Sequence, residues 1–231
     1  MKNIVIGTTY VDFKSQGKPD RANQQSVAMQ VLSELPSWVY PVAITSNKDS
    51  EFEELKELGI PQLRLLKQDT TQKFGNVVKP LPYVKDIMEI LQKIDCDIFG
   101  LINSDILITE KVCHYLQKDF ETFVFQRSDI EKIDKEEFQE GLFKFIQDGN
   151  IHVGADGFFF QRWWWLKYKN MFSSNLVYAE TEWDTYYRRV MAEKSKCMQS
   201  RCLYHVYHEQ TWNTWGILAQ NNIKILMGII K

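Results

Sequence analysis

The sequence lacks the charge bias and the long apolar runs that would assign a protein at once to a specialised class. Its 231 residues include 28 basic and 30 acidic side chains, so the formal net charge is −2. Without a basic excess, a nucleic acid is a poor candidate for the partner. The longest apolar runs, such as residues 225–230, are far too short to be a transmembrane segment.

Closely spaced cysteine pairs are also missing. Four cysteines are present, and no two of them form a C-x-x-C pair. Residues 1–7 predict a first strand rather than a signal peptide, so we expect reduced thiols and a cytoplasmic protein. Residues 223–230 are expected to form a closing core strand, with a peripheral contact to a membrane surface as the alternative.

The phosphate-binding fingerprints are absent as well. No G-x-G-x-x-G follows the first strand, and no G-x-x-x-x-G-K-[ST] occurs anywhere. Any nucleotide must therefore be held by loop side chains, and a metal ion would meet the charge of a diphosphate.

What is present is enough apolar material for a core and a regular alternation of elements. Hydrophobic residues make up 44% of the chain and aromatic residues 13%, which argues against disorder. Strands and helices alternate through the first half, and this indicates βαβ units and a parallel sheet. The pattern predicts strands at 4–10, 38–44, 62–66 and 120–125, helices at 24–35 and 50–58, and a charged helix or loop at 131–140.

The central feature is a short apolar run, residues 97–106, that ends in Asn103, Ser104 and Asp105. It predicts a buried parallel strand, preceded by a helix at 82–94. In open α/β sheets, ligands bind at the carboxyl ends of strands, which is where these polar residues fall. Because Thr109 is the better placed cap for the next helix, a ligand role for Asp105 is favoured over capping.

Three further groups could carry chemistry. Asp156 lies between glycines, where it could bind a ligand or simply close a turn into a strand at 158–160. Asp184 lies near a helix start, where acids interact favourably with the helix dipole. His205 and His208 lack a third ligand at zinc spacing, and a histidine among aromatic residues is more often part of the core. Tryptophans at 163–165, 212 and 215 could stack on sugars, although three adjacent ones cannot all face one way.

Taken in order, N-S-D at a strand tip, G-x-D-x-F-x-F, a W-D helix start and a late histidine resemble the nucleotide-sugar glycosyltransferases of GT-A fold. The resemblance runs from about residue 4 to residue 208. It implies a single domain over 1–231, a three-layer α/β/α sandwich around a mainly parallel sheet. Residues 1–126 would bind a nucleoside-diphosphate sugar, and residues 127–231 would receive a carbohydrate or other hydroxyl acceptor.

The resemblance also implies roles for individual residues. The family's metal-binding D-x-D corresponds to Asn103, Ser104 and Asp105, and Asn103 can offer an amide oxygen but no charge. The expected cofactor is Mn²⁺ or Mg²⁺, with Asp105, Asn103 and His208 as ligands. The positive groups available to a diphosphate are Lys79, Lys85 and Arg127. The expected donor-binding residues are Thr8, Thr9, Tyr10, Lys79, Asn103, Ser104 and Asp105.

Direct displacement at a sugar carbon needs a carboxylate that takes the proton of the acceptor. Asp184 is the first candidate for this base and Asp156 the second. Two alternatives stay open. One is a catalytically decayed module of the same fold, which Asn103 suggests; the other is a nucleotidylyltransferase, although residues 7–10 lack the glycine-rich basic loop such an enzyme needs.

Overall fold

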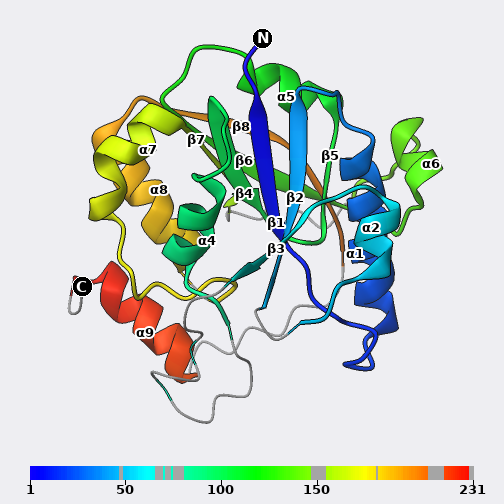
Figure 1. Ribbon diagram of the computed structural model, residues 1–231, viewed down its shortest axis with the longest axis horizontal. Coiled ribbons are helices and arrows are strands. Elements are labelled where there is room, and N and C mark those ends of the chain that lie inside the picture. The colour runs from blue at the N-terminus through cyan, green and yellow to red at the C-terminus, as the bar shows by residue number, and fades with distance from the viewer. Residues whose placement is uncertain are drawn as a thin grey trace.

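One mixed sheet forms the centre of the molecule, and helices cover both of its faces (Figure 1). The structure is a computed structural model. It describes residues 1–46, 49–65, 70, 74, 81–146, 155–180, 182–207 and 216–228.

Within these residues the sheet has eight strands in the order β3-β2-β1-β4-β7-β6-β8-β5. The first four are mutually parallel, and β6 and β8 are also parallel to each other. β7 is antiparallel to both β4 and β6, and β5 is antiparallel to β8. The strands are β1 Ile4–Thr9, β2 Val39–Ser46, β3 Gln62–Leu65, β4 Ile98–Ile102, β5 Ile106–Ile108, β6 Thr122–Ile130, β7 Ala155–Gln161 and β8 Cys197–Val206.

The helices form two layers, one on each face of the sheet (Figure 1). One face packs against α1 Pro19–Ser33, α2 Glu53–Glu57, α5 Glu110–Leu116 and α6 Lys135–Gln139. The other packs against α4 Val84–Leu91, α7 Arg162–Tyr168, the 3-10 turn η1 Lys169–Met171, α8 Trp183–Lys194 and α9 Ile217–Leu226.

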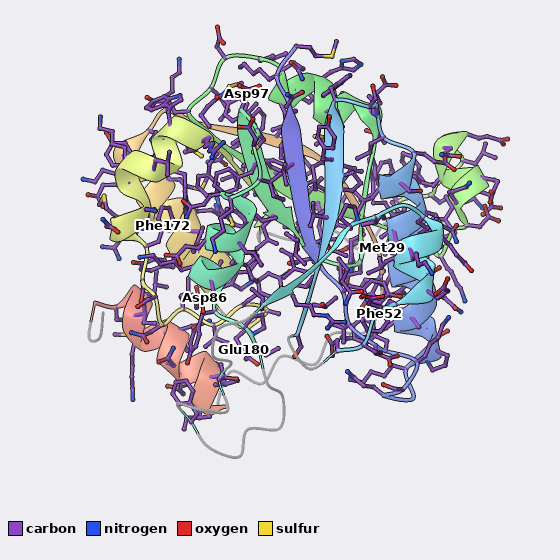
Figure 2. The ribbon with its side chains drawn as sticks, in the orientation of Figure 1. Met29, Phe52, Asp86, Asp97, Phe172 and Glu180 are labelled. Carbon is purple, nitrogen blue, oxygen red and sulfur yellow. The ribbon has the colours of Figure 1, made fainter. Side chains whose placement is uncertain are left out.

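Side chains alternate in direction along each strand, and this produces two separate cores. Ile4 and Ile6 of β1 join the core under α1, whereas Val5 joins the core under α4. This division follows from the two-residue period of a strand, which sends neighbouring side chains to opposite faces. Figure 2 shows Met29 of α1 and Phe172, which follows η1, on opposite sides of the sheet.

The predicted fold class is confirmed: the structure is an α/β/α sandwich in which four of the seven strand pairings are parallel. Strands from both predicted halves, 1–126 and 127–231, belong to the one sheet. The division of labour between these halves stays a prediction. No helix among the residues described is long and apolar enough to cross a membrane.

Several element boundaries differ from those predicted. The first helix begins at Pro19, five residues before the predicted start, because proline suits the first helical position. The run 97–106 is two strands rather than one. β4 ends at Ile102, the chain turns through residues 103–105, and β5 crosses to the far edge of the sheet beside β8. Thr109 occupies the N-cap position of α5, but its side chain makes no capping hydrogen bond.

The predicted strand over residues 223–230 is wrong, because residues 217–226 form the helix α9. Its buried residues recur with helical spacing and are Leu218, Ala219, Asn221, Asn222 and Ile225. The side-chain amides of the two buried asparagines bond to the backbone of Asn175 and Val177.

Asp156 does not close a turn; it is the second residue of β7. The charged segment 131–140 contains the short helix α6, which Asp134 and Glu137 close with a reciprocal capping box. The tryptophan triplet divides as expected, since Trp164 and Trp165 are buried and Trp163 is exposed.

The thiols are reduced, as predicted. Burial raises the pKa of Cys96 to about 11 and that of Cys113 to about 12, so both remain uncharged near neutral pH.

Gly100 lies opposite Phe159 in the pairing of β4 with β7, and its lack of a side chain gives a testable prediction. A Cβ atom there would lie 2.3 Å from Phe159 Cδ1 and 2.5 Å from the Phe158 carbonyl oxygen. We expect Gly100→Ala to lower the free energy of unfolding by about 3 kcal/mol in urea titrations, because the backbone oxygen cannot move aside.

Gly59→Ala serves as the control, since Gly59 has φ +67° and open space around it. Its cost should stay near 1 kcal/mol, the strain of a left-handed residue. Equal losses in the two variants would contradict the close approach of β4 and β7.

Candidate functional site

The turn between β4 and β5 lies at the carboxyl ends of two parallel strands. β1 pairs in parallel with β4, so Thr8 lies opposite Ile102 at the end of the pairing. The turn is closed by the Ile106 amide, which donates to the Asn103 carbonyl at 3.3 Å. The Asn103 amide in turn donates to the Asp156 carbonyl at 3.3 Å. The predicted strand tip is therefore a real turn, anchored to the neighbouring strand β7.

Both ends of the Asn103 side chain are engaged. Its Nδ2 donates to Asp156 Oδ1 at 2.7 Å. Its Oδ1 accepts from the Tyr178 hydroxyl at 2.9 Å. Because an amide has distinct donor and acceptor ends, these two partners determine which way the group points.

Asp156 is a buried carboxylate paired with a buried cation. Arg127 Nη1 lies 3.0 Å from Asp156 Oδ1, and the two side chains are only 6% and 4% exposed. Arg127 Nε also lies 3.2 Å from Asp129 Oδ1. One guanidinium thus serves two carboxylates, and the arrangement depends on all three being present.

His205 connects this cluster to Asp105. Its Nδ1 lies 2.8 Å from Asp129 Oδ1, and its Nε2 lies 3.4 Å from Asp105 Oδ2. Burial lowers the pKa of His205, but hydrogen bonds to Asp105 and Asp129 raise it, and the net shift is upward. The Asp105 side chain keeps 28% of its surface exposed, whereas His205 keeps 1%. Asp105 is therefore the more accessible member of the pair.

The end of β1 reaches the same turn through Tyr178. Thr9 Oγ1 donates to the Tyr178 hydroxyl at 3.4 Å, and that hydroxyl donates to Asn103. Burial raises the pKa of Tyr178, so its hydroxyl remains a donor. Tyr10 is turned to α2, where its hydroxyl donates to Glu54. Of the three residues predicted at the end of β1, Thr9 is linked to the turn by hydrogen bonds through the Tyr178 hydroxyl. Thr8 is buried in the sheet.

The segment that carries Tyr178 is held from two sides. Asn222 of α9 accepts from the Val177 amide and donates to the Val177 carbonyl, both at 2.8 Å. On the other side, the Tyr178 amide donates to the Pro82 carbonyl at 3.0 Å. The helix α9 thereby helps to place Tyr178 against the turn 103–105, which lies far earlier in the chain than α9 itself.

Asp184 lies in the first turn of α8, as its sequence position predicted. Its Oδ2 accepts from the Ala155 amide at 3.2 Å, immediately before Asp156. The preceding turn is strained, since Ala179 and Glu182 have φ values of +58° and +72°. Figure 2 shows Glu180 of this turn at the end of the sheet opposite Asp97, which precedes β4. The two predicted bases are thus brought close together, and the turn before α8 lies at the carboxyl end of β4.

Two of the predicted site residues, Lys79 and His208, lie outside the described residues, as do Trp212 and Trp215. The described residues contain no group of three histidine, cysteine, aspartate or glutamate side chains able to hold a metal ion. Lys85 is engaged elsewhere, since its Nζ donates to the Phe172 carbonyl at 3.3 Å.

Sequence reasoning missed two residues of this cluster. Asp129 is two positions beyond Arg127 on β6, so their side chains share a face, and this spacing could have indicated the pair. Tyr178 gave no such signal, because its place depends on α9 and on residues 82–84. His208, the histidine expected to be a metal ligand, lies outside the described residues; among those described, His205 lies beside Asp105.

The sheet order and the two helical layers are those of a GT-A-type fold, which the chain shares with solved structures of low sequence identity. One similar solved structure is S. aureus TarS 1-349 in complex with UDP-GlcNAc, with a TM-score of 0.60 and 9% identity. The alignment covers 99% of this chain and 65% of the TarS chain, so the protein spans just under two thirds of that relative.

A second similar structure is glucosyl-3-phosphoglycerate synthase from Mycobacterium tuberculosis in complex with Mg²⁺ and UDP. Its TM-score is 0.53 at 12% identity, with 98% of this chain and 79% of that chain covered. No protein-family model and no curated protein sequence matches the chain. At such low identities, the likeness establishes the fold.

The shared guanidinium gives a prediction for stability. Arg127→Met should lower the free energy of unfolding by about 3–5 kcal/mol, because Asp156 and Asp129 lose a buried partner. Arg162→Met is the matched control, since Arg162 pairs at 3.0 Å with the fully exposed Asp95. That change should cost no more than about 1 kcal/mol. Equal losses in urea titrations would show that Arg127 is not the centre of the cluster.

Proposed function

We propose that the protein is a glycosyltransferase that moves a sugar from a nucleoside-diphosphate sugar to a hydroxyl acceptor, a carbohydrate in the first instance. The observation that carries this proposal is the turn after β4 on a GT-A fold. There a partly exposed carboxylate, Asp105, stands beside His205 at the carboxyl end of the parallel strands. Ligands of open α/β sheets bind at such ends.

The residues present fit a divalent cation held mainly by Asp105. Mg²⁺ and Mn²⁺ are commonly bound by one or two carboxylates together with water and substrate phosphates. Asp105 supplies the carboxylate, and Nε2 of His205 faces it, while Asp129 engages Nδ1 of the same ring. Metal-binding histidines usually have their second ring nitrogen bonded to a carboxylate or carbonyl in this way. Asn103 is a weaker ligand than the resemblance implied, because its amide oxygen already accepts from Tyr178.

Charge is the main demand of the reaction. Cleavage of a sugar–phosphate bond leaves negative charge on the departing diphosphate, and fixed positive groups must stabilise it. A bound cation supplies such charge as a Lewis acid. In this chain the turn 103–105 orients Asp105, the carboxylate that would hold the cation. The cluster around Arg127 keeps that turn in place. Ser104 of the turn and Thr9 at the end of β1 are proposed to contact the donor.

Of the two candidate bases, the geometry favours Asp184. Asp156 is buried and ion-paired with Arg127, so its carboxylate is occupied. Asp184 accepts one backbone hydrogen bond and is only partly buried at the start of α8. An accessible carboxylate is what removal of the acceptor's proton requires. We therefore propose Asp184 as the base and assign Asp156 to the support of the turn.

The acceptor would approach from the half of the chain that carries α8, residues 127–231. The donor would lie mainly against residues 1–126. Residues 127–231 also contribute side chains to the carboxyl end of the parallel strands, where the donor would bind: Arg127, Asp129, Asp156 and His205. The two halves would therefore meet at the turn after β4.

Nucleotide binding tests the proposal directly. UDP or GDP with Mn²⁺ should raise the melting temperature of the wild-type protein, because a ligand that binds the folded state stabilises it. Asp105→Asn should weaken nucleotide binding about tenfold or more in calorimetric titrations with Mn²⁺ while the fold is retained. Asp95→Asn, at the exposed opposite end of the sheet, is the control and should bind as the wild type does. If no nucleotide shifts the wild-type melting temperature, the decayed-module alternative replaces the transferase.

Turnover tests the base. With a nucleotide sugar that the protein binds, Asp184→Asn should lower the rate of sugar transfer about a hundredfold or more while donor affinity changes little. Glu193→Gln, in the last turn of the same helix, is the control and should keep the wild-type rate. An Asp184→Asn variant with wild-type turnover would remove Asp184 from the mechanism.

A further inference from the structure

Position 103 carries an amide where the GT-A pattern has an acid, and the surroundings of this amide explain the difference. Asn103 Nδ2 donates to Asp156 Oδ1 at 2.7 Å. The same oxygen accepts from Arg127 Nη1 at 3.0 Å. On the opposite side, Asn103 Oδ1 accepts from Tyr178. The amide is therefore the link between an ion pair and a tyrosine hydroxyl.

A carboxylate at position 103 could keep only one of these two contacts. It can accept from Tyr178, but it has no hydrogen to donate to Asp156. Two carboxylates would then face each other at the distance of the present hydrogen bond, with Asp156 only 3% exposed. Like charges at such a separation destabilise each other strongly when they are removed from water.

Among the side chains of this cluster, the carboxylates already outnumber the cations. Arg127 and His205 face three carboxylates, those of Asp105, Asp129 and Asp156. Arg127 is shared between Asp129 and Asp156. A fourth carboxylate would gain no cation of its own among these groups.

We propose that Asn103 is a positioning residue matched to Asp156. The pair of amide and carboxylate fixes the turn that presents Ser104 and Asp105, and Asn103 itself does not hold the cation or the diphosphate. The amide is then a working substitution in a rearranged cluster, and it is not a sign of decay. This inference rests on the proposed function only in assigning the donor to Asp105.

Exchanging the amide of Asn103 and the carboxylate of Asp156 tests whether the two positions are matched, and the test needs no measurement of enzyme activity. Asn103→Asp should lower the melting temperature by about 10 °C, as expected for an uncompensated buried charge in a chain of this size. Asp156→Asn alone should also lower it, because Arg127 loses a partner. The double variant Asn103→Asp/Asp156→Asn restores one carboxylate and one amide with their positions exchanged. Its melting temperature should recover at least half of the loss seen in Asn103→Asp.

The exchange variant remains informative even if Asn103→Asp does not fold, since recovery of a folded protein by the second change is then the expected result. A melting temperature of Asn103→Asp within 2 °C of the wild type would overturn the proposal. So would a double variant whose loss equals or exceeds the sum of the two single losses, because independent sites behave additively.

Donor binding separates positioning from contact. If Asn103 only positions the turn, the double variant should bind UDP with Mn²⁺ within about threefold of the wild-type affinity, whereas Asp105→Asn should lose about tenfold or more. A double variant that regains stability but loses donor affinity as Asp105→Asn does would show that Asn103 contacts the donor. If the wild type binds no nucleotide, the proposed function fails, and the melting temperatures still decide whether positions 103 and 156 are matched.

Discussion

The buried guanidinium of Arg127, shared by Asp129 and Asp156, is the interaction on which the rest of the site depends. Burying a charge is costly, and the cost is met only when the remaining polar atoms are bonded as well. Asn103 bonds to Asp156 and His205 to Asp129, so each carboxylate has a second partner. Groups from β6, β7, β8 and the turn after β4 are therefore coupled, and a change in one displaces the others.

The second constraint on the site is the position of Tyr178, in the segment that follows η1. Tyr178 reaches the turn only because α9 and residues 82–84 hold its neighbours by backbone hydrogen bonds. The residues that follow have positive φ at Ala179 and Glu182, and they lead directly into the helix that carries Asp184. Strain of this kind persists where surrounding contacts overdetermine the backbone. Through Tyr178, the proposed donor turn and the proposed base are parts of one connected structure.

The likeness to solved structures establishes the fold, and the proposed function depends on the chemistry of the turn after β4. At 9% and 12% identity, the likeness to TarS and to the synthase concerns the path of the chain. The proposal of a transferase therefore depends on particular groups: a partly exposed carboxylate at Asp105, a histidine beside it, and a partly exposed carboxylate at Asp184 in the first turn of α8. We propose that the departure from the family pattern at Asn103 reflects its two hydrogen-bond partners, Asp156 and Tyr178.

The sequence alone determined the class of fold and the place of the turn. Its alternation of strands and helices predicts a parallel sheet, and the polar residues that follow an apolar strand predict a site at its carboxyl end. It could not decide that β5 crosses to the far edge, that residues 217–226 are helical, or that His205 lies beside Asp105. Local patterns record only the period of burial, so they locate the strands but not the residues at which the strands end. Strand order and the partners of buried charges depend on contacts between distant residues, and these are chosen by how side chains fit once the chain has folded.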